Sequence, residues 1–260
     1  MADNAAPSEA LKDEPVVLQR GVQAHGGLNK WKQFGAVEYD FSLEMGDVSR
    51  SDHHVVDLYS RDARVEGEAY TIGVTDTSAW AAPSMEAYGF HAPPRFYGKA
   101  YPYLFSVPFV FGDPGVETEA VGQRELQGST YNVVKVTFEQ GVGDTPEDVY
   151  YVYCDPNSHR VRAALFSVTF RNPSIQRPIT GVLYDWKTVD GLTVPEKGEM
   201  YAVTEDLTFK KKLGSLRYSN VDFKKTPPPA STFAMPEDAV RDRSLRVLQK
   251  KRAKAKANED

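Results

Sequence analysis

The stretch VEYDFSLEM, residues 37–45, decides the fold class, because its apolar and polar side chains alternate strictly. The polar positions are taken by Glu38, Asp40, Ser42 and Glu44. Successive side chains of a strand point to opposite faces, so alternation places all the apolar side chains on one face. The stretch therefore predicts a half-buried β-strand whose apolar face consists of Val37, Tyr39, Phe41, Leu43 and Met45.

Ten further segments resemble strands and are mostly separated by Gly, Pro, Asn and Asp. They lie at 50–59, 62–69, 70–75, 116–125, 130–140, 148–155, 160–171, 179–189, 192–203 and 206–223. Asp190-Gly191 is typical of a two-residue hairpin loop. Short turns between neighbours favour an antiparallel meander, and a large open sheet normally curls. We expect a mainly β fold, a strongly curved antiparallel sheet of about ten strands that forms an incomplete barrel.

Short helices flank the predicted strands. Residues 15–25, PVVLQRGVQAH, begin with a proline suited to a first helical turn and precede two glycines suited to a helix end. LNKWKQF, residues 28–34, predicts one more turn. These N-terminal pieces and a central helix are too few for an α/β fold, so we expect them to cover the sheet.

The chain divides by composition into three parts. We expect residues 1–14 to be disordered, residues 15–236 to form a single half-barrel domain, and residues 237–260 to be a basic tail that is helical or disordered. FAMPEDAV, which begins at Phe233, is expected to return to the body of the domain. The start of the sequence lacks the basic and apolar regions of a secretory signal.

Composition limits the classes of function. The net charge is −5, which argues weakly against nucleic acid as the main partner. No apolar run approaches the roughly 18–20 residues of a membrane helix. Cys154 is the only cysteine, so an internal disulfide is excluded. Its place in a tyrosine-rich strand predicts a small core residue instead of a nucleophile.

The most unusual stretch is PPRFYGKAYPYLFSVPFVFGDPG, residues 93–115, which is crowded with aromatic side chains. Pro102 and Pro108 argue against one regular helix, so we expect a short helix with a proline break and then an aromatic loop. Each aromatic side chain buries about 150–250 Å². The stretch must therefore cover a large apolar surface, either as closed core on the concave face of the sheet or as the lining of a ligand cavity.

The cavity interpretation predicts a set of ligand-binding side chains. Arg95 is the candidate for contact with a head group, and Tyr88 and Phe90 are candidates for the rim. The predicted ligand-binding residues are Trp80, Arg95, Phe96, Tyr97, Tyr101, Phe105, Phe109 and Phe111.

An acidic stretch, GDTPEDVYYVYCD at residues 143–155, offers a different chemistry. With His25, the carboxylates Asp144, Glu147 and Asp148 are candidates for a hydrolase or a metal-assisted enzyme. The spacing lacks the regular oxygen positions of a calcium loop. A turn that leads into a strand explains the same acids. An inward Asp148 would need a buried partner, for which Arg162 and Arg171 are the candidates.

The histidines are also open to two interpretations. His25, before two glycines, is either catalytic or a buried imidazole bonded to a carbonyl group. His53 and His54 point to opposite faces of a strand, so they cannot share one metal, whereas Asp52 and His54 share a face and form only a weak metal pair. No GxSxG or phosphate-binding glycine motif is present. We therefore expect no catalytic residue, metal or cofactor.

Four motifs in order resemble an uncharacterised bacterial family of exported or lipid-anchored envelope proteins. They are AHGGLNKWKQF (24–34), the aromatic stretch at 93–115, VTFEQGVGDTPEDVYYVYCD (136–155), and VTFRN with YDWKTVDGLTVPEKGEMY (168–201). The similarity covers roughly residues 20–225. The fold that this resemblance implies is similar to the lipoprotein carriers of the Lol system, which hold acyl chains in an apolar cavity. The resemblance implies a location in the periplasm or cell envelope, and it implies no catalytic residues.

Together these observations predict binding or carriage of a lipid or another apolar ligand in the concave face of a half-barrel. The expected partner is an apolar small molecule, with transient contact to a membrane surface, no nucleic acid, and a monomeric state. Two alternatives stay open at this point. One is a hydrolase or metal-assisted enzyme that uses His25 and the acidic cluster, and the other is a structural envelope protein without a ligand.

Overall fold

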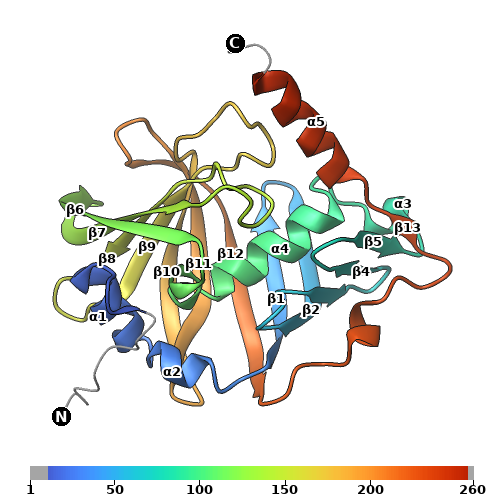
Figure 1. Ribbon diagram of the computed structural model, residues 1–260, viewed down its shortest axis with the longest axis horizontal. Helices are drawn as coiled ribbons and strands as arrows, with labels where there is room; N and C mark the ends of the chain where they lie inside the picture. Colours follow the sequence, from blue (N-terminus) through green and yellow to red (C-terminus); the bar gives the residue numbers. More distant parts are fainter. Residues whose placement is uncertain (1–10, 257–260) are drawn as a thin grey trace. The chain divides into compact units, whose positions relative to one another are not determined.

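The computed structural model of the protein describes residues 11–256. Across these residues the chain forms thirteen antiparallel strands and a few helices (Figure 1). The strand order is β13-β5-β4-β3-β2-β1-β12-β11-β10-β9-β8-β7-β6, and the sheet is not closed into a barrel. The predicted fold class, a mainly β protein with an incomplete antiparallel barrel, is confirmed, with thirteen strands in place of about ten.

The strands are β1 (Ala36–Met45), β2 (Val48–Asp57), β3 (Ala63–Glu66), β4 (Thr71–Val74), β5 (Ala79–Ala82), β6 (Val116–Leu126), β7 (Ser129–Phe138), β8 (Tyr150–Cys154), β9 (Val161–Phe166), β10 (Thr180–Val189), β11 (Leu192–Val203), β12 (Phe209–Lys224) and β13 (Val240–Arg241). The helices are α1 (Val16–Ala24), α2 (Leu28–Trp31), α3 (Met85–Tyr88), α4 (Pro94–Phe105) and α5 (Ser244–Lys256), with short 3-10 helices η2 (Phe109–Gly112) and η3 (Ala230–Phe233).

Each of the eleven predicted strand segments overlaps a strand of the structure, with bounds that differ by a few residues. Asp190 and Gly191 both have positive φ, 50° and 75°, and join β10 to β11 as the predicted hairpin loop. The sequence did not predict β5 and β13. The four residues of β5, AWAA, are apolar without alternation, and β13 has only two residues, so neither carries the periodic signal of a strand.

The aromatic stretch differs from its prediction in where the helix breaks. Pro102 lies inside α4, and the helix ends only at Phe105. A proline removes its own N–H from the helix, and the buried side chains of Tyr101, Leu104 and Phe105 hold the last turn in place by packing. The segment after the break is the 3-10 helix η2 instead of an irregular loop.

The chain forms two compact units. Unit 1 contains residues up to Lys32 together with Ser106–Ser215, and unit 2 contains Gln33–Phe105 together with the residues from Leu216 onward. The long strand β12 contributes its first part to unit 1 and its second part to unit 2. The predicted division into an N-terminal segment, one domain and a tail stays a prediction, and residues 1–10 lie outside the described residues.

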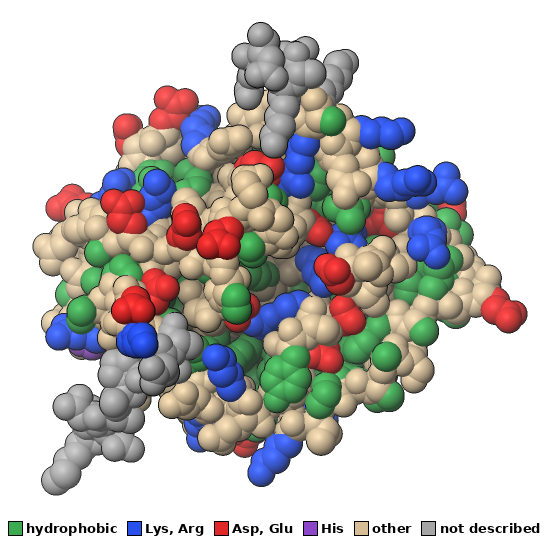
Figure 2. Space-filling view, viewed as in Figure 1, with side chains coloured by type: hydrophobic (Ala, Val, Ile, Leu, Met, Phe, Trp, Pro, Cys, Tyr) green, Lys and Arg blue, Asp and Glu red, His purple; other side chains and the backbone are tan. Residues whose placement is uncertain are grey.

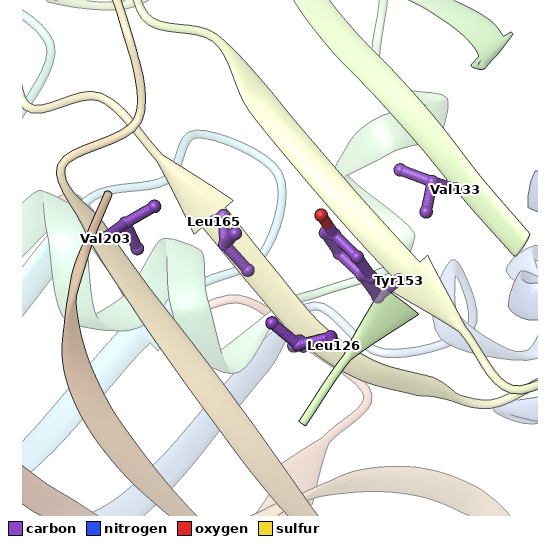
Figure 3. Packing of buried hydrophobic residues seen from close by; sticks show 6 residues of the cluster. Leu126, Val133, Tyr153, Leu165 and Val203 are labelled. Atoms are coloured by element: carbon purple, nitrogen blue, oxygen red, sulfur yellow. The ribbon is translucent and has the colours of Figure 1, made fainter. Parts of the chain in front are cut away.

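Unit 1 buries both faces of its sheet. On β7, the neighbouring residues Val133 and Val134 point to opposite faces, and both are fully buried. One face carries the apolar cluster around Tyr153 of β8, which Figure 3 shows together with Leu126, Val133, Leu165 and Val203.

Unit 2 is organised by α4, which packs on β3, β4 and β5. Its aromatic side chains also reach β1, where the ring of Tyr101 lies 4.8 Å from that of Phe41 and the ring of Phe105 lies 4.7 Å from that of Tyr39. Phe233 is buried in this unit, as the sequence predicted. The interior of unit 2 is therefore rich in aromatic rings from both helix and sheet.

Candidate functional site

Three polar side chains follow one another along the face of β2 that looks toward α4. Arg50, Asp52 and His54 are spaced by two residues, which places them on one face at intervals of about 7 Å. Asp52 is 4% exposed and His54 is fully buried, whereas Arg50 is half-buried. We call these three residues the β2 polar row. Charged and polar groups in such an interior are costly unless they are paired.

Asp52 is paired by two tyrosines. The hydroxyl groups of Tyr70 and Tyr97 both donate hydrogen bonds to its carboxylate, one to each oxygen. Burial raises the pKa of both phenols, and the neighbouring Asp52 charge raises it further. Both tyrosines therefore stay neutral donors, and the buried carboxylate is satisfied by charge-assisted hydrogen bonds.

Arg50 is surrounded by aromatic rings. Its guanidinium carbon lies 4.5–5.2 Å from the ring centroids of Tyr70, Tyr88, Phe90 and Tyr97, within the range of cation–π attraction. One nitrogen, Nη1, donates to the carbonyl oxygen of Tyr88 at 3.0 Å. The other two nitrogens, Nε and Nη2, are buried and have no acceptor in hydrogen-bonding geometry among the described residues, although the Tyr70 hydroxyl interacts with the guanidinium. The cage therefore holds the cation but leaves one edge of the guanidinium unused.

His54 is buried without a hydrogen-bonding partner. Its ring stacks on Tyr39 with centroids 5.0 Å apart, and neither ring nitrogen has a partner in the described part of the chain. Burial lowers the pKa of His54 to about 3, so the imidazole is neutral at pH 7. The Tyr39 hydroxyl is likewise buried and unpaired within the same range. Each such buried group costs about 1–3 kcal/mol, which makes this cluster exceptional in the fold.

Three of the predicted ligand-binding residues lie on α4 beside the β2 polar row. Tyr97 donates to Asp52, and Tyr101 and Phe105 pack on rings of β1. The helix comes very close to β4 at Gly98, where an added Cβ would lie 2.6 Å from Cγ2 of Val74. A glycine is needed here because any side chain would push α4 away from the sheet.

Trp80 and Arg95 make other contacts within unit 2. The indole Nε1 of Trp80 donates to the carbonyl oxygen of Phe233 at 3.1 Å. Arg95 is 3% exposed, and its guanidinium donates to the carbonyl oxygens of Thr75 at 3.1 Å and Asp76 at 2.7 Å. Two of its nitrogens are thus engaged by the chain itself, and contact of Arg95 with a head group stays a prediction.

Of the remaining predicted ligand-binding residues, two do not belong to the unit of the β2 polar row. Phe96 is half-buried on α4. Phe109 and Phe111 belong to η2 of unit 1, where Phe109 stacks on Trp31 with centroids 4.4 Å apart and Phe111 lies 6.1 Å from the ring of Tyr150. The aromatic stretch is therefore shared between two units, and no residue pattern in it marks the change. Arg50 was not among the predicted ligand-binding residues. Its spacing of two residues from Asp52, and of four from His54, is nevertheless a signal in the sequence that could have identified it.

His25 of unit 1 is fully buried and held by main-chain groups. Its Nδ1 donates to the carbonyl oxygen of Thr193 at 2.8 Å, and its Nε2 accepts from the backbone N–H of Val161 at 3.1 Å. Burial lowers the pKa of His25 to about 4. Both nitrogens are occupied, which favours the interpretation of a buried imidazole bonded to a carbonyl group over a catalytic one.

Asp148 of the acidic stretch has a structural role through its contacts. Asp148 is buried and accepts hydrogen bonds from Ser167 Oγ at 2.7 Å and from the backbone N–H of Thr169 at 2.9 Å. Its partners are therefore Ser167 and Thr169, whereas the sequence suggested Arg162 or Arg171. Burial raises the pKa of the Cys154 thiol to about 12, which suits an unreactive core residue.

Within residues 11–256 no three His, Cys, Asp or Glu side chains gather in a way that would hold a metal ion. No helix in that range combines the length and the apolar character needed to cross a membrane.

The chain is similar in sequence to an uncharacterised family and similar in fold to solved structures. Residues 94–174 match a family of unknown function (DUF6503). No curated protein matches the chain. The matched residues include most of the aromatic stretch and the whole motif at 136–155, so the predicted resemblance to an uncharacterised family is confirmed.

Two solved structures are similar in fold. A LolA superfamily protein from Nitrosomonas europaea is 11% identical with a TM-score of 0.50, and the match covers 84% of this chain and 96% of that one. A DUF1329 family protein from Desulfovibrio piger is 9% identical with a TM-score of 0.51, covering 84% of this chain and 98% of that one. At such low identity the likeness establishes the fold alone, and it confirms the predicted LolA-like architecture.

Proposed function

We propose that this protein binds or carries a lipid or another apolar ligand on the face of unit 2 that α4 covers. The observation that carries the proposal is the β2 polar row, whose Arg50 and His54 have buried nitrogens without partners in an otherwise aromatic interior. An apolar lining with a few unsatisfied polar groups is typical of ligand sites. The LolA-like fold supports the same function, and with it a location in the periplasm or cell envelope.

Entry of a ligand requires α4 to move. The rings of Tyr101 and Phe105 lie against rings of β1, so an acyl chain must separate the helix from the strand. Burial of CH₂ groups is worth about 0.8 kcal/mol each, so a dodecyl chain gains on the order of 9 kcal/mol before ordering costs. That gain is of the size needed to replace the contacts of a few aromatic rings. We therefore infer that α4 acts as the cover of the site.

A reversible cross-link between α4 and β4 tests this proposal. An ideal Cβ at Gly98 lies 3.4 Å from Cβ of Val74, close to the roughly 3.5–4.5 Å found in disulfides. The double variant Gly98→Cys/Val74→Cys, made in a Cys154→Ala background, should bind dodecanoate at least tenfold more weakly when oxidised than when reduced. Isothermal titration calorimetry measures both states on the same preparation.

The double variant Gly98→Ser/Val74→Ser in the same background and under the same oxidant is the matched control, because it carries a similar steric change at both positions without the cross-link. Equal binding by the oxidised and reduced double cysteine variant would show that α4 is not the cover. If the wild-type protein binds neither dodecanoate nor a longer lipid, and none is carried through purification, the proposed function itself is wrong.

We also propose transient contact with an anionic membrane surface through α5. Lysine and arginine side chains gather in the upper right of Figure 2, where Figure 1 places α5. The exposed basic residues of α5 include Arg246, Lys250 and Lys251, and the exposed Arg243 directly precedes the helix. Each basic residue near an anionic bilayer contributes about 1 kcal/mol. The protein, expected to be a monomer, should sediment with phosphatidylglycerol vesicles but not with phosphatidylcholine vesicles, and equal sedimentation would remove this proposal.

A further inference from the structure

Arg50 presents an unused hydrogen-bonding edge inside unit 2. A guanidinium group has five N–H donors in a planar fork. Nη1 of Arg50 donates to the carbonyl oxygen of Tyr88, and the guanidinium also interacts with the hydroxyl group of Tyr70. Nε and Nη2 lie on one edge of the fork, and both are buried without an acceptor in the described residues. Such an edge matches two oxygens of a carboxylate or a phosphate, which it binds in bidentate fashion.

The charge of Arg50 has no carboxylate in ion-pair contact, although Asp52 attracts it from further along the strand. Asp52 is the nearest acid along the strand, but its two oxygens accept from Tyr70 and Tyr97, and no carboxylate of the described residues forms an ion pair with Arg50. The aromatic rings around the guanidinium restrict its position without neutralising it. The cation is therefore held in place while its charge stays available to an anion.

The positions of the three residues along β2 indicate how a ligand would be oriented. Arg50 is half-buried near the start of β2, whereas Asp52 and His54 lie deeper on the same face. An amphipathic ligand gains most when its charged end stays toward solvent and its apolar end lies among aromatic side chains. The order of the β2 polar row thus fits a head group at Arg50 and a chain directed toward α4.

We propose that Arg50 receives the anionic head group of the ligand, with two carboxylate or phosphate oxygens accepting from Nε and Nη2. This inference rests on the proposed function, since it names the chemistry of the ligand in the same site. It assigns to Arg50 the role that the sequence suggested for Arg95, whose Nη1 and Nη2 already donate to backbone carbonyls of Thr75 and Asp76.

Ligands with one chain and different heads test the inference. Dodecanoate, dodecyl phosphate and dodecanol share the same tail, so differences in their affinity at pH 8 report on the head group. Wild-type protein should bind the two anions at least tenfold more tightly than dodecanol. The stronger of the two anions distinguishes a free acid from a phosphate head.

Variants at Arg50 assign the preference to this side chain. Arg50→Met should reduce the preference for the anions over dodecanol to within twofold, and urea denaturation of this variant reports whether the fold is retained. Arg50→Lys keeps the charge but not the fork, so it should keep part of the preference. Arg64→Met is the matched control, because Arg64 lies on the neighbouring strand of unit 2 and pairs with Glu66 at 2.6 Å; it should behave as wild type.

The outcomes separate this inference from the proposed function. Equal affinity of the wild-type protein for all three ligands overturns the head-group role while leaving apolar binding in place. If the preference for anionic ligands is kept in Arg50→Met but lost in Arg95→Met, Arg95 and not Arg50 contacts the head group. Absence of binding for all three ligands overturns both proposals.

Discussion

Two buried histidines show how the two units of this protein differ. His25 in unit 1 and His54 in unit 2 are both 0% exposed, and burial lowers the pKa of each well below that of a free imidazole. The chain satisfies both nitrogens of His25 through Thr193 and Val161, whereas it provides no partner for either nitrogen of His54 within the described residues. Burial alone therefore does not distinguish a structural histidine from a candidate ligand contact; pairing does.

The buried charged groups of the two units show a similar contrast, although Thr169 Oγ1 of unit 1 is also buried and unpaired within the described residues. Asp148 in unit 1 accepts from a serine and a backbone N–H that belong to its own sheet region. In unit 2 Asp52 is paired by tyrosines, but the adjacent Arg50 and His54 keep unpaired nitrogens. A fold tolerates such groups when they serve a purpose other than stability. The comparison locates that purpose in unit 2.

The largest expected effect on stability comes from removing His25, whereas removal of His54 should have little effect. His25→Ala deprives Thr193 and Val161 of their partner and leaves a cavity, so it should lower the free energy of unfolding by about 4 kcal/mol. His54→Leu removes no hydrogen bond and should change that free energy by less than about 1 kcal/mol, or raise it. Urea denaturation measures both.

His53→Ala serves as the control for these substitutions, because His53 is a partly exposed neighbour that contacts only surface acids. Equal losses in His25→Ala and His54→Leu would show that the chain needs both imidazoles for stability, and the contrast between the units would fail.

Acid should weaken the folded state through both histidines. Each folded-state pKa, about 4 for His25 and about 3 for His54, lies below the ordinary value of 6.5, so the unfolded chain binds more protons as the pH falls below 6.5. Stability is therefore lost on the acid side, by about 2 kcal/mol for each histidine at pH 5. His54→Leu should lose about 2 kcal/mol less than wild type between pH 7 and pH 5, as measured by urea denaturation at both values. An unchanged pH dependence would mean that His54 titrates normally in the folded protein.

A smaller effect is expected from the tyrosine that pairs with Asp52. Tyr97→Phe removes one of the two donors to a buried carboxylate and should cost about 1.5–3 kcal/mol, since hydrogen bonds to charged groups are stronger than neutral ones. Ser167→Ala removes the corresponding donor to Asp148 in unit 1 and should cost a similar amount. A negligible loss in Tyr97→Phe beside a clear loss in Ser167→Ala would show that Asp52 finds other partners.

Surface ion pairs should matter least, and equally in both units. Lys224 pairs with Asp222 at 2.5 Å in unit 2, and Arg177 pairs with Glu205 at 3.5 Å in unit 1. Replacing either basic residue by glutamine should change the free energy of unfolding by no more than about 0.5 kcal/mol, because exposed pairs gain little. Thermal melts in low and high salt measure the difference, and a loss above 1 kcal/mol in one unit only would reveal an unrecognised role.

Local sequence patterns predicted most of the strands, but they predicted only some of the residues around the β2 polar row. The alternation in residues 37–45 involves only neighbouring residues, and so does the Asp190-Gly191 turn. Both can therefore be recognised from the sequence. The pairing of His25 with Thr193 spans 168 residues, and Tyr97 reaches Asp52 across 45 residues. No periodic signal encodes such contacts. Arg50 was missed for this reason, since the rings around it come from separate segments that only the folded chain brings together.

Hydrogen exchange measured by mass spectrometry, with and without dodecanoate, tests the central claim most directly. The account predicts slower exchange with ligand in peptides from β2, residues 48–57, and α4, residues 94–105, while peptides from α1, residues 16–24, are unchanged. Protection confined to unit 1, or no protection while the ligand is bound, would contradict a binding site between α4 and the β2 polar row.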